Sequence, residues 1–167
     1  MGREVRRIKR GWVHPVNDDG KPMPLFGRSY AKAVADWDAE CAKWCEGQRP
    51  DYCDDETLRS DVYGYYLWAG QRPQPHDYMP DFGDEADMLV MYESTSEGTP
   101  ISPAFETPEE LAKWLADNDA SSFGRMTATY EQWLNVCRGA FAPSMVIKGD
   151  RIMSGPEATA PAPDPKT

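Results

Sequence analysis

The sequence contains no hydrophobic run that approaches the roughly 20 apolar residues needed to cross a bilayer, so we expect no membrane-spanning segment. The first ten residues are basic, but no apolar stretch follows them, which argues against a secretory signal. Without an export signal, the four cysteines are expected to be reduced thiols. The chain is therefore expected to work in a cytoplasm.

Catalytic motifs are also scarce. The segment from Ser94 to Thr99 lacks the glycine pattern, the lysine and the following helix of a phosphate-binding loop. Only His14 and His76 could act as histidine bases, and no spacing favours pairing either of them with Cys137. The sequence predicts a protein that is not an enzyme and needs no cofactor. A cryptic hydrolase built around His76 or an acidic pair is one alternative.

Negative charge is abundant and unevenly spread. Five basic residues and one acidic residue lie in the first ten positions, so the remaining residues carry a formal charge of -14. A surface this acidic repels phosphates, and direct nucleic-acid binding is not expected. High aromatic content, with six Trp and eight Tyr, excludes a disordered chain. We expect a soluble globular protein suited to a cationic protein partner.

Local patterns predict three helices. Ser29 precedes apolar residues at helical spacing and predicts a helix over 30–45, with Gly47 as a stop. Thr107-Pro-Glu-Glu110 predicts a helix that begins with a capping box, and Thr129 with Gln132 predicts another that ends at Gly139.

Short strands complete the predicted fold. The candidate strands are residues 4–9, an aromatic run at 65–68, an apolar run at 88–93 and a hairpin of 145–147 with 151–153. Basic residues in the first strand suit a sheet edge. A short helix is expected at 56–63. These elements predict an α+β fold with a small, mostly antiparallel sheet.

The sequence predicts one folded domain followed by a tail. Residues 1–153 are expected to form one globular domain. Residues 154–167 contain four prolines and no large apolar side chain, so they are expected to form a flexible tail.

The cysteines offer a metal-binding alternative. Cys41 and Cys45 lie four residues apart on one predicted helix face, and Cys53 follows in an acidic loop. Three thiolates could bind zinc if a fourth ligand joined them. The helix places the first two among tryptophans, however, and cysteine in such a stripe usually packs as a small hydrophobic residue. We expect buried thiols, with a zinc-supported module in DNA metabolism as the alternative.

Aromatic and acidic residues alternate between residues 52 and 85. Tyrosine and tryptophan recur at protein-binding hot spots because they supply a large contact area at low entropic cost. Clustered carboxylates on loops are typically solvated and add negative charge to such a surface. The residues predicted to bind a partner are Asp54, Asp55, Glu56, Tyr78, Asp81, Phe82, Asp84 and Glu85.

One stretch carries a family resemblance. Residues 92–115, Y-E-S-T-S-E-G-T-P-I-S-P-A-F-E-T-P-E-E-L-A-K-W-L, resemble a segment found in a family of proteins encoded by tailed bacteriophages and prophages. In that family, the corresponding segment has the sequence S-E-G-S-P-I-S-P-V-F, followed by T-P-E-E-L-A-x-W. The start of the chain resembles the family's R-E-V-R-R-V, the element from Trp12 to Pro15 its W-x-H-P, and residues 139–146 its G-W-A-P-S-F-V.

The resemblance is limited in extent and in what it implies. Residues 16–87 match poorly, and this chain lacks the CxxC pairs of many family members. A phage origin implies action inside an infected bacterial host. We therefore expect an acidic accessory protein that binds a host protein or complex with a cationic surface. An inhibitor of a host defence complex of the CRISPR kind, acting as a partial DNA mimic, fits this expectation.

Overall fold

The chain folds as two compact units. The computed structural model describes residues 2–53, 57–94 and 98–159. The sheet unit comprises Met1–Gly27 and Asp81–Thr167, and the helical unit, Arg28–Pro80, is inserted between them. The single globular domain expected over residues 1–153 stays a prediction. Aromatic side chains of the inserted segment pack with one another into a core of their own.

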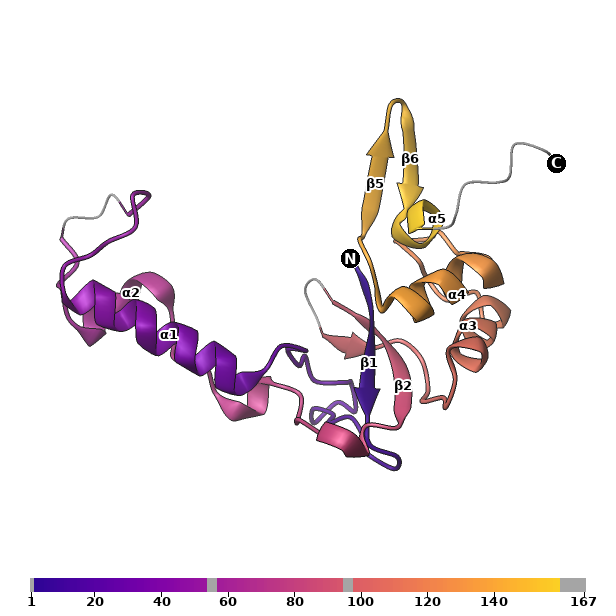
Figure 1. Ribbon diagram of the computed structural model, residues 1–167, viewed down its shortest axis with the longest axis horizontal. Coiled ribbons are helices and arrows are strands. Elements are labelled where there is room, and N and C mark those ends of the chain that lie inside the picture. The colour runs from indigo at the N-terminus through magenta and orange to yellow at the C-terminus, as the bar shows by residue number, and fades with distance from the viewer. Residues whose placement is uncertain (1, 54–56, 95–97, 160–167) are drawn as a thin grey trace. The chain divides into compact units, whose positions relative to one another are not determined.

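The sheet unit is built on four antiparallel strands in the order β3-β2-β1-β4 (Figure 1). β1, Arg3–Ile8, pairs with β2, Met88–Glu93, along its whole length. Two short strands, β3 (Thr99–Pro100) and β4 (Phe141–Ala142), flank this pair. Together with the helices, this arrangement confirms the predicted α+β class with a mostly antiparallel sheet.

The position of β1 corrects an expectation. β1 lies between β2 and β4 and is not an edge strand. Two of its basic residues, Arg3 and Arg6, are buried. Arg3 Nε donates to the Ser121 carbonyl oxygen at 2.8 Å, and Arg6 lies over the Tyr92 ring, 4.4 Å from its centroid. Arginine tolerates this burial because carbonyl groups and a ring face satisfy the planar guanidinium.

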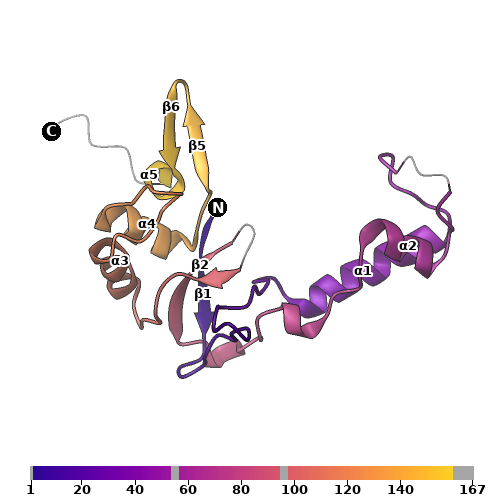
Figure 2. The same ribbon diagram turned by 180° about the vertical axis from the view of Figure 1, so that it is seen from behind.

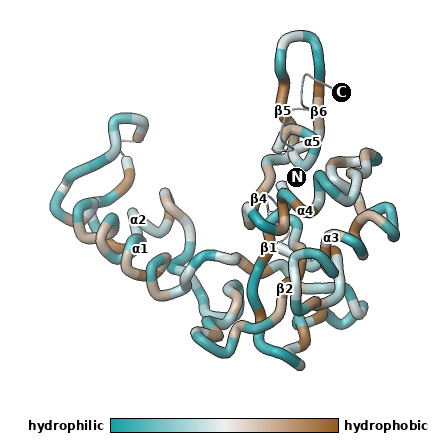
Figure 3. The backbone as a smooth tube through the Cα atoms, turned by 45° about the vertical axis from the view of Figure 1, so that its right-hand side comes forward, coloured by the Kyte–Doolittle hydropathy of each residue, from teal (hydrophilic) through white to brown (hydrophobic). Residues whose placement is uncertain are grey.

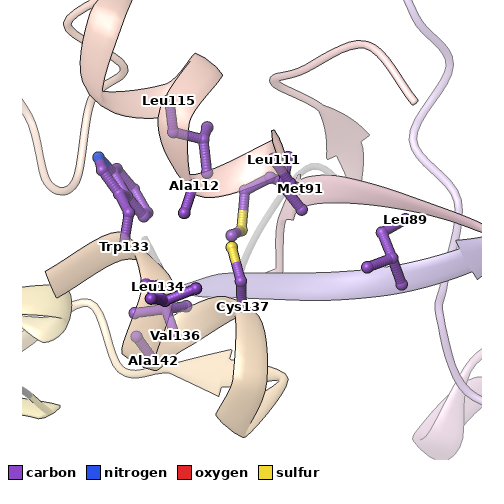
Figure 4. Packing of buried hydrophobic residues seen from close by; sticks show 10 residues of the cluster. All are labelled: Leu89, Met91, Leu111, Ala112, Leu115, Trp133, Leu134, Val136, Cys137 and Ala142. Atoms are coloured by element: carbon purple, nitrogen blue, oxygen red, sulfur yellow. The ribbon is translucent and has the colours of Figure 1, made fainter. Parts of the chain in front are cut away.

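Helices α3 (Pro108–Asp117) and α4 (Tyr130–Gly139) form beside the β1–β2 pair, as Figure 1 and Figure 2 show from opposite sides. Both begin with the predicted capping boxes, Thr107 with Glu110 and Thr129 with Gln132. Their apolar faces meet β2 and β4 in the main core (Figure 4). The buried core residues are Leu89, Met91, Leu111, Ala112, Leu115, Trp133, Leu134, Val136, Cys137 and Ala142.

A two-stranded hairpin follows the core. β5, Met145–Lys148, pairs with β6, Arg151–Ser154, as predicted. Figure 3 shows hydrophobic stretches in both strands, where Ile147 and Ile152 face each other across the pair and are exposed. α5, Gly155–Thr159, packs at the base of the hairpin.

The first residues of the expected tail are ordered: Ser154 ends β6, and Gly155–Thr159 form α5. Ser154, Gly155 and Pro156 are buried, because a short helix continues directly from the hairpin. A side chain at Gly155 would collide with the Pro143 carbonyl oxygen, so the backbone packs closely there. Residues 160–167 lie outside the described ranges.

The helical unit consists of α1, Tyr30–Cys45, α2, Val62–Ala69, and the short 3-10 helix η1, Pro75–Asp77. α1 confirms the first predicted helix, and the Ser29 hydroxyl accepts from Lys32 N as its cap. The strand expected at 65–68 is wrong, since these residues belong to α2. The short helix expected at 56–63 is also wrong, because α2 begins only at Val62.

No helix in the described ranges combines the length and the apolar character that crossing a membrane requires. The longest of them, α1, has 16 residues and carries charged side chains along its length.

Candidate functional site

The interior of the helical unit is aromatic. The rings of Trp44 in α1 and Trp68 in α2 stack with their centroids 5.3 Å apart, and Trp37 meets Tyr65 edge to face at 5.0 Å. Trp44 Nε1 donates to the Arg59 carbonyl oxygen at 2.8 Å. These contacts fix α2 on α1 through one side of α2, the side that bears Tyr65 and Trp68.

Local sequence signals define both ends of α2. The Asp61 carboxylate accepts from Gly64 N at 2.8 Å and caps the start. At the other end, Gly70 takes a φ of 85° and its amide bonds the Tyr66 carbonyl oxygen. Positive φ suits glycine because it lacks a Cβ. The aromatic run thus forms a helix, although its residue types also suit a strand.

The opposite side of α2 is apolar and exposed. Val62, Tyr63, Tyr66 and Leu67 form this side, which we name the α2 outer face, and each has between 46% and 60% of its surface exposed. The spacing of i, i+1, i+4 and i+5 places all four on one stripe. A helix that is apolar all round is typically buried all round, and here the described residues of the helical unit cover one side only. Such a surface typically marks an interaction site.

Two tyrosines give the α2 outer face a defined geometry. The rings of Tyr63 and Tyr66 are close to parallel, with an interplanar angle of 20° and centroids 6.2 Å apart. Both rings belong to side chains that are about half exposed. The pair therefore leaves a large area of aromatic surface exposed to solvent.

Negative charge precedes this face in the chain. Residues 46–61 contain six acidic and two basic side chains. The two basic ones are engaged inside the unit: Arg49 lies over the Trp44 ring, 4.6 Å from its centroid, and bonds the Leu58 carbonyl, and Arg59 pairs with Asp61 at 2.6 Å. The segment is therefore net negative. The predicted partner-binding residues Asp54, Asp55 and Glu56 belong to it but lie outside the described residues.

Tyr78 does not serve as a surface anchor. It is 5% exposed, its ring lies 5.5 Å from that of Tyr30, and its hydroxyl accepts from Arg28 at 3.4 Å. Packing against α1 takes up the area that the sequence assigned to a partner. This corrects the expectation for Tyr78.

The other predicted partner-binding residues belong to the sheet unit, around the 3-10 helix η2, Gly83–Glu85. Asp81 accepts from Gly83 N at 3.0 Å, and Glu85 pairs with Lys9 at 2.5 Å. Asp84 is exposed. Phe82 is half-buried and meets Trp12 edge to face at 5.4 Å. Asp81 and Phe82 thus have local structural roles, and the acidic residues here remain accessible.

Sequence reasoning missed the α2 outer face. It recognised an aromatic region but assigned the run to a strand, in which alternate residues would point to opposite sides. A sequence signal for this helix was available. Asp61 is a typical helix N-cap, the eight residues from 62 to 69 carry no charge, and Gly70 is a typical helix stop. That signal predicts a helix whose circumference is apolar.

The cysteines do not form a metal site among the described residues, where no group of three or more potential ligands is found. Cys41 is buried, Cys53 is partly buried and Cys45 is exposed, which corrects the expectation of three buried thiols. Burial and the neighbouring Cys45 raise the pKa of the Cys41 thiol. A raised pKa opposes the thiolate that a metal needs.

The acid–base candidates differ in burial and belong to different units. Burial in the main core raises the pKa of Cys137 to about 12, so its thiol is protonated at neutral pH. His76 belongs to the helical unit and is exposed, whereas Cys137 belongs to the sheet unit. His14 is engaged in the sheet unit, with its two ring nitrogens bonded to Tyr92 and Met23.

A pocket of about 380 Å³ beside α3 and α4 is lined by charged side chains and Tyr130. Arg138 bonds Glu109 and lowers the pKa of that carboxyl, Lys113 pairs with Asp117 at 2.6 Å, and Glu110 accepts from Thr107 N. A general acid needs a raised pKa, whereas that of Glu109 is lowered. The three carboxylates cap and brace the two helices.

Comparisons with known proteins identify no relative of this chain. No protein-family model, no curated protein and no solved structure matches this chain. The α2 outer face is therefore described by its own chemistry, an exposed apolar helix face that follows a net-negative segment in the chain.

Proposed function

We propose that this chain is an accessory protein that acts by binding another protein. The contact surface is the α2 outer face together with the acidic segment 46–61. The partner surface is cationic with apolar pockets, because that chemistry complements both parts. No bond is made or broken in this role.

The α2 outer face is the observation that carries the proposal. Val62, Tyr63, Tyr66 and Leu67 remain about half exposed although α2 is apolar on every side. Burying the remaining surface of such side chains is worth on the order of 1 kcal/mol each, which gives a partner a clear gain. Tyrosines at the centre of the face are typical hot-spot residues.

The resemblance to the tailed-phage family indicates where the partner is found. A phage protein meets its partners in the cytoplasm of the infected bacterium. Host defence complexes of the CRISPR kind hold nucleic acid in cationic channels, and a net-negative protein with exposed aromatic rings suits such a channel. We therefore propose an inhibitor that occupies such a channel as a partial DNA mimic.

Affinity capture tests the proposal. The full chain is immobilised and exposed to a lysate of a bacterial host, and any captured protein is purified and titrated directly. Tyr63→Ser with Tyr66→Ser is expected to weaken that binding at least about tenfold, since two half-buried ring contacts are lost. Near-ultraviolet circular dichroism of the tryptophan core checks that the helical unit stays folded.

Ile147→Ser with Ile152→Ser is the matched control. These two side chains are also exposed and apolar but belong to the hairpin of the sheet unit. Binding is expected to survive this change. Equal loss in both variants, or no specific capture by the parent chain, would contradict the proposal.

A further inference from the structure

Arginine and aromatic rings pair repeatedly inside this protein. Arg6 lies 4.4 Å from the centroid of the Tyr92 ring, and Arg49 lies 4.6 Å from that of Trp44. Both guanidiniums also donate to backbone carbonyl groups, those of Leu25 and Leu58. These pairs show the two contacts that hold an arginine here, a ring face and an oxygen acceptor.

The Tyr63–Tyr66 pair supplies the same ring faces at the surface. Its rings are close to parallel and about half exposed. In the described part of the chain, no arginine or lysine lies over either ring. The two ring faces are thus available to a cation from another molecule.

Oxygen acceptors come from the same stretch of chain. Asp61 lies two residues before Tyr63, caps α2, pairs with Arg59 and keeps 35% of its side chain exposed. The helical unit as a whole contains ten acidic and six basic residues. The charge of this unit therefore favours a cationic ligand and disfavours phosphates.

Guanidinium fits this surface better than ammonium. A guanidinium is planar, stacks on an aromatic face and is weakly hydrated, so it loses little on leaving water. A lysine ammonium is a compact and strongly hydrated charge. Stacking on exposed rings therefore discriminates between two partners that carry equal charge.

We propose that the paired rings of Tyr63 and Tyr66 bind arginine side chains, so that the partner segment is arginine-rich and not merely cationic. This inference rests on the proposed protein-binding function. It adds the chemical identity of the contact, in which guanidinium groups stack on the rings while carboxylates of the helical unit accept their N–H groups.

Two short peptides test the inference on the full chain. They have identical length and charge and differ only in carrying arginine or lysine at every cationic position, with glycine and serine between. Fluorescence anisotropy is expected to show at least about fivefold tighter binding of the arginine peptide, the discrimination that a ring contact of this kind supplies. Raising the salt concentration is expected to weaken both peptides.

Variants locate the preference. Tyr63→Ala with Tyr66→Ala is expected to bring the two peptides to equal affinity, and Tyr63→Phe with Tyr66→Phe is expected to keep the arginine preference because the rings remain. Ile147→Ala with Ile152→Ala, in the hairpin, is expected to change neither affinity. Tryptophan fluorescence confirms that each variant retains the Trp44–Trp68 core.

The outcomes separate this inference from the proposed function. Equal binding of the two peptides, or an arginine preference that survives loss of both rings, overturns the arginine inference. Affinity capture that still depends on the α2 outer face would then leave the protein-binding role intact. Tight binding of a single-stranded oligonucleotide that is lost with the two rings would overturn both.

Discussion

Gly64 packs directly against the backbone of Arg59: a Cβ built at Gly64 would lie 1.9 Å from the Arg59 carbonyl oxygen. The same oxygen accepts the indole N–H of Trp44. The start of α2, the chain before it and the aromatic core of the helical unit therefore meet at one point, and only glycine fits there.

Gly64→Ala is expected to destabilise the helical unit by about 1–3 kcal/mol, because the added methyl group must displace backbone. Urea unfolding followed by tryptophan fluorescence measures this. Gly139→Ala is the control, since a Cβ at Gly139 meets nothing within 4 Å. Equal stability of the two variants would show that a methyl group at position 64 fits beside the Arg59 carbonyl oxygen without displacing it.

Arg3→Met is expected to lower the free energy of unfolding by about 3 kcal/mol. Arg3 is 2% exposed, bonds the Ser121 carbonyl oxygen and lies 4.0 Å from the Glu93 carboxylate. Its loss leaves a buried acceptor and a largely buried carboxylate without their cation. Chemical denaturation gives the change in free energy of unfolding.

Arg7→Met is the control for that substitution. Arg7 lies on the same strand but is exposed, and its guanidinium donates to the Ala86 carbonyl oxygen at 3.2 Å. The expected change is below about 1 kcal/mol. If Arg7→Met were as costly as Arg3→Met, the burial of Arg3 would not be the cause.

Stability is expected to fall on acidification through His14. Burial lowers the pKa of His14 below its ordinary value of 6.5. In the neutral ring, Nε2–H donates to the Met23 carbonyl oxygen and Nδ1 accepts from the Tyr92 hydroxyl. Below pH 6.5 the unfolded chain takes up the proton more readily than the folded one, so this contribution is lost as pH falls through the folded-state pKa.

Urea unfolding between pH 5 and pH 7.5 tests the role of His14. His14→Gln is expected to reduce the slope of stability against pH, and His76→Gln, at an exposed position, is expected to leave it unchanged. A slope that is identical in the parent chain and in His14→Gln would assign the pH dependence to carboxylates instead.

Cysteine reactivity is expected to differ sharply between Cys45 and Cys137. Cys45 is exposed on α1, whereas Cys137 is buried with its pKa raised to about 12. Figure 4 shows the sulfur of Cys137 beside that of Met91 in the core. Iodoacetamide is expected to label Cys45 in the folded protein and Cys137 only after denaturation, as read by peptide mass spectrometry. Labelling at equal rates in native buffer would contradict the burial of Cys137.

Much of the fold follows from local sequence signals. α3 and α4 begin where Thr107 and Thr129 predict, because a capping box satisfies backbone amides within four residues and needs no distant contact. β2 likewise follows from an apolar run, and the hairpin around Gly149 from a turn between two short apolar stretches. The candidate site was only partly predicted: its region was recognised as aromatic and acidic, but its residues were not.

Tertiary structure alone decided the rest. Residues 65–68 suit a strand by type, yet Tyr65 and Trp68 pack on Trp44 at a spacing that only a helix provides, and this leaves Tyr63 and Tyr66 on the open side. Arg3 is stabilised in the interior because its Nε–H donates a hydrogen bond to the carbonyl oxygen of Ser121, which is far away in sequence. The sequence by itself determined where helices start and how much charge the chain carries, since those depend on neighbours along the backbone. Which side of α2 meets solvent depends on contacts between distant segments, and only the folded chain brings those together.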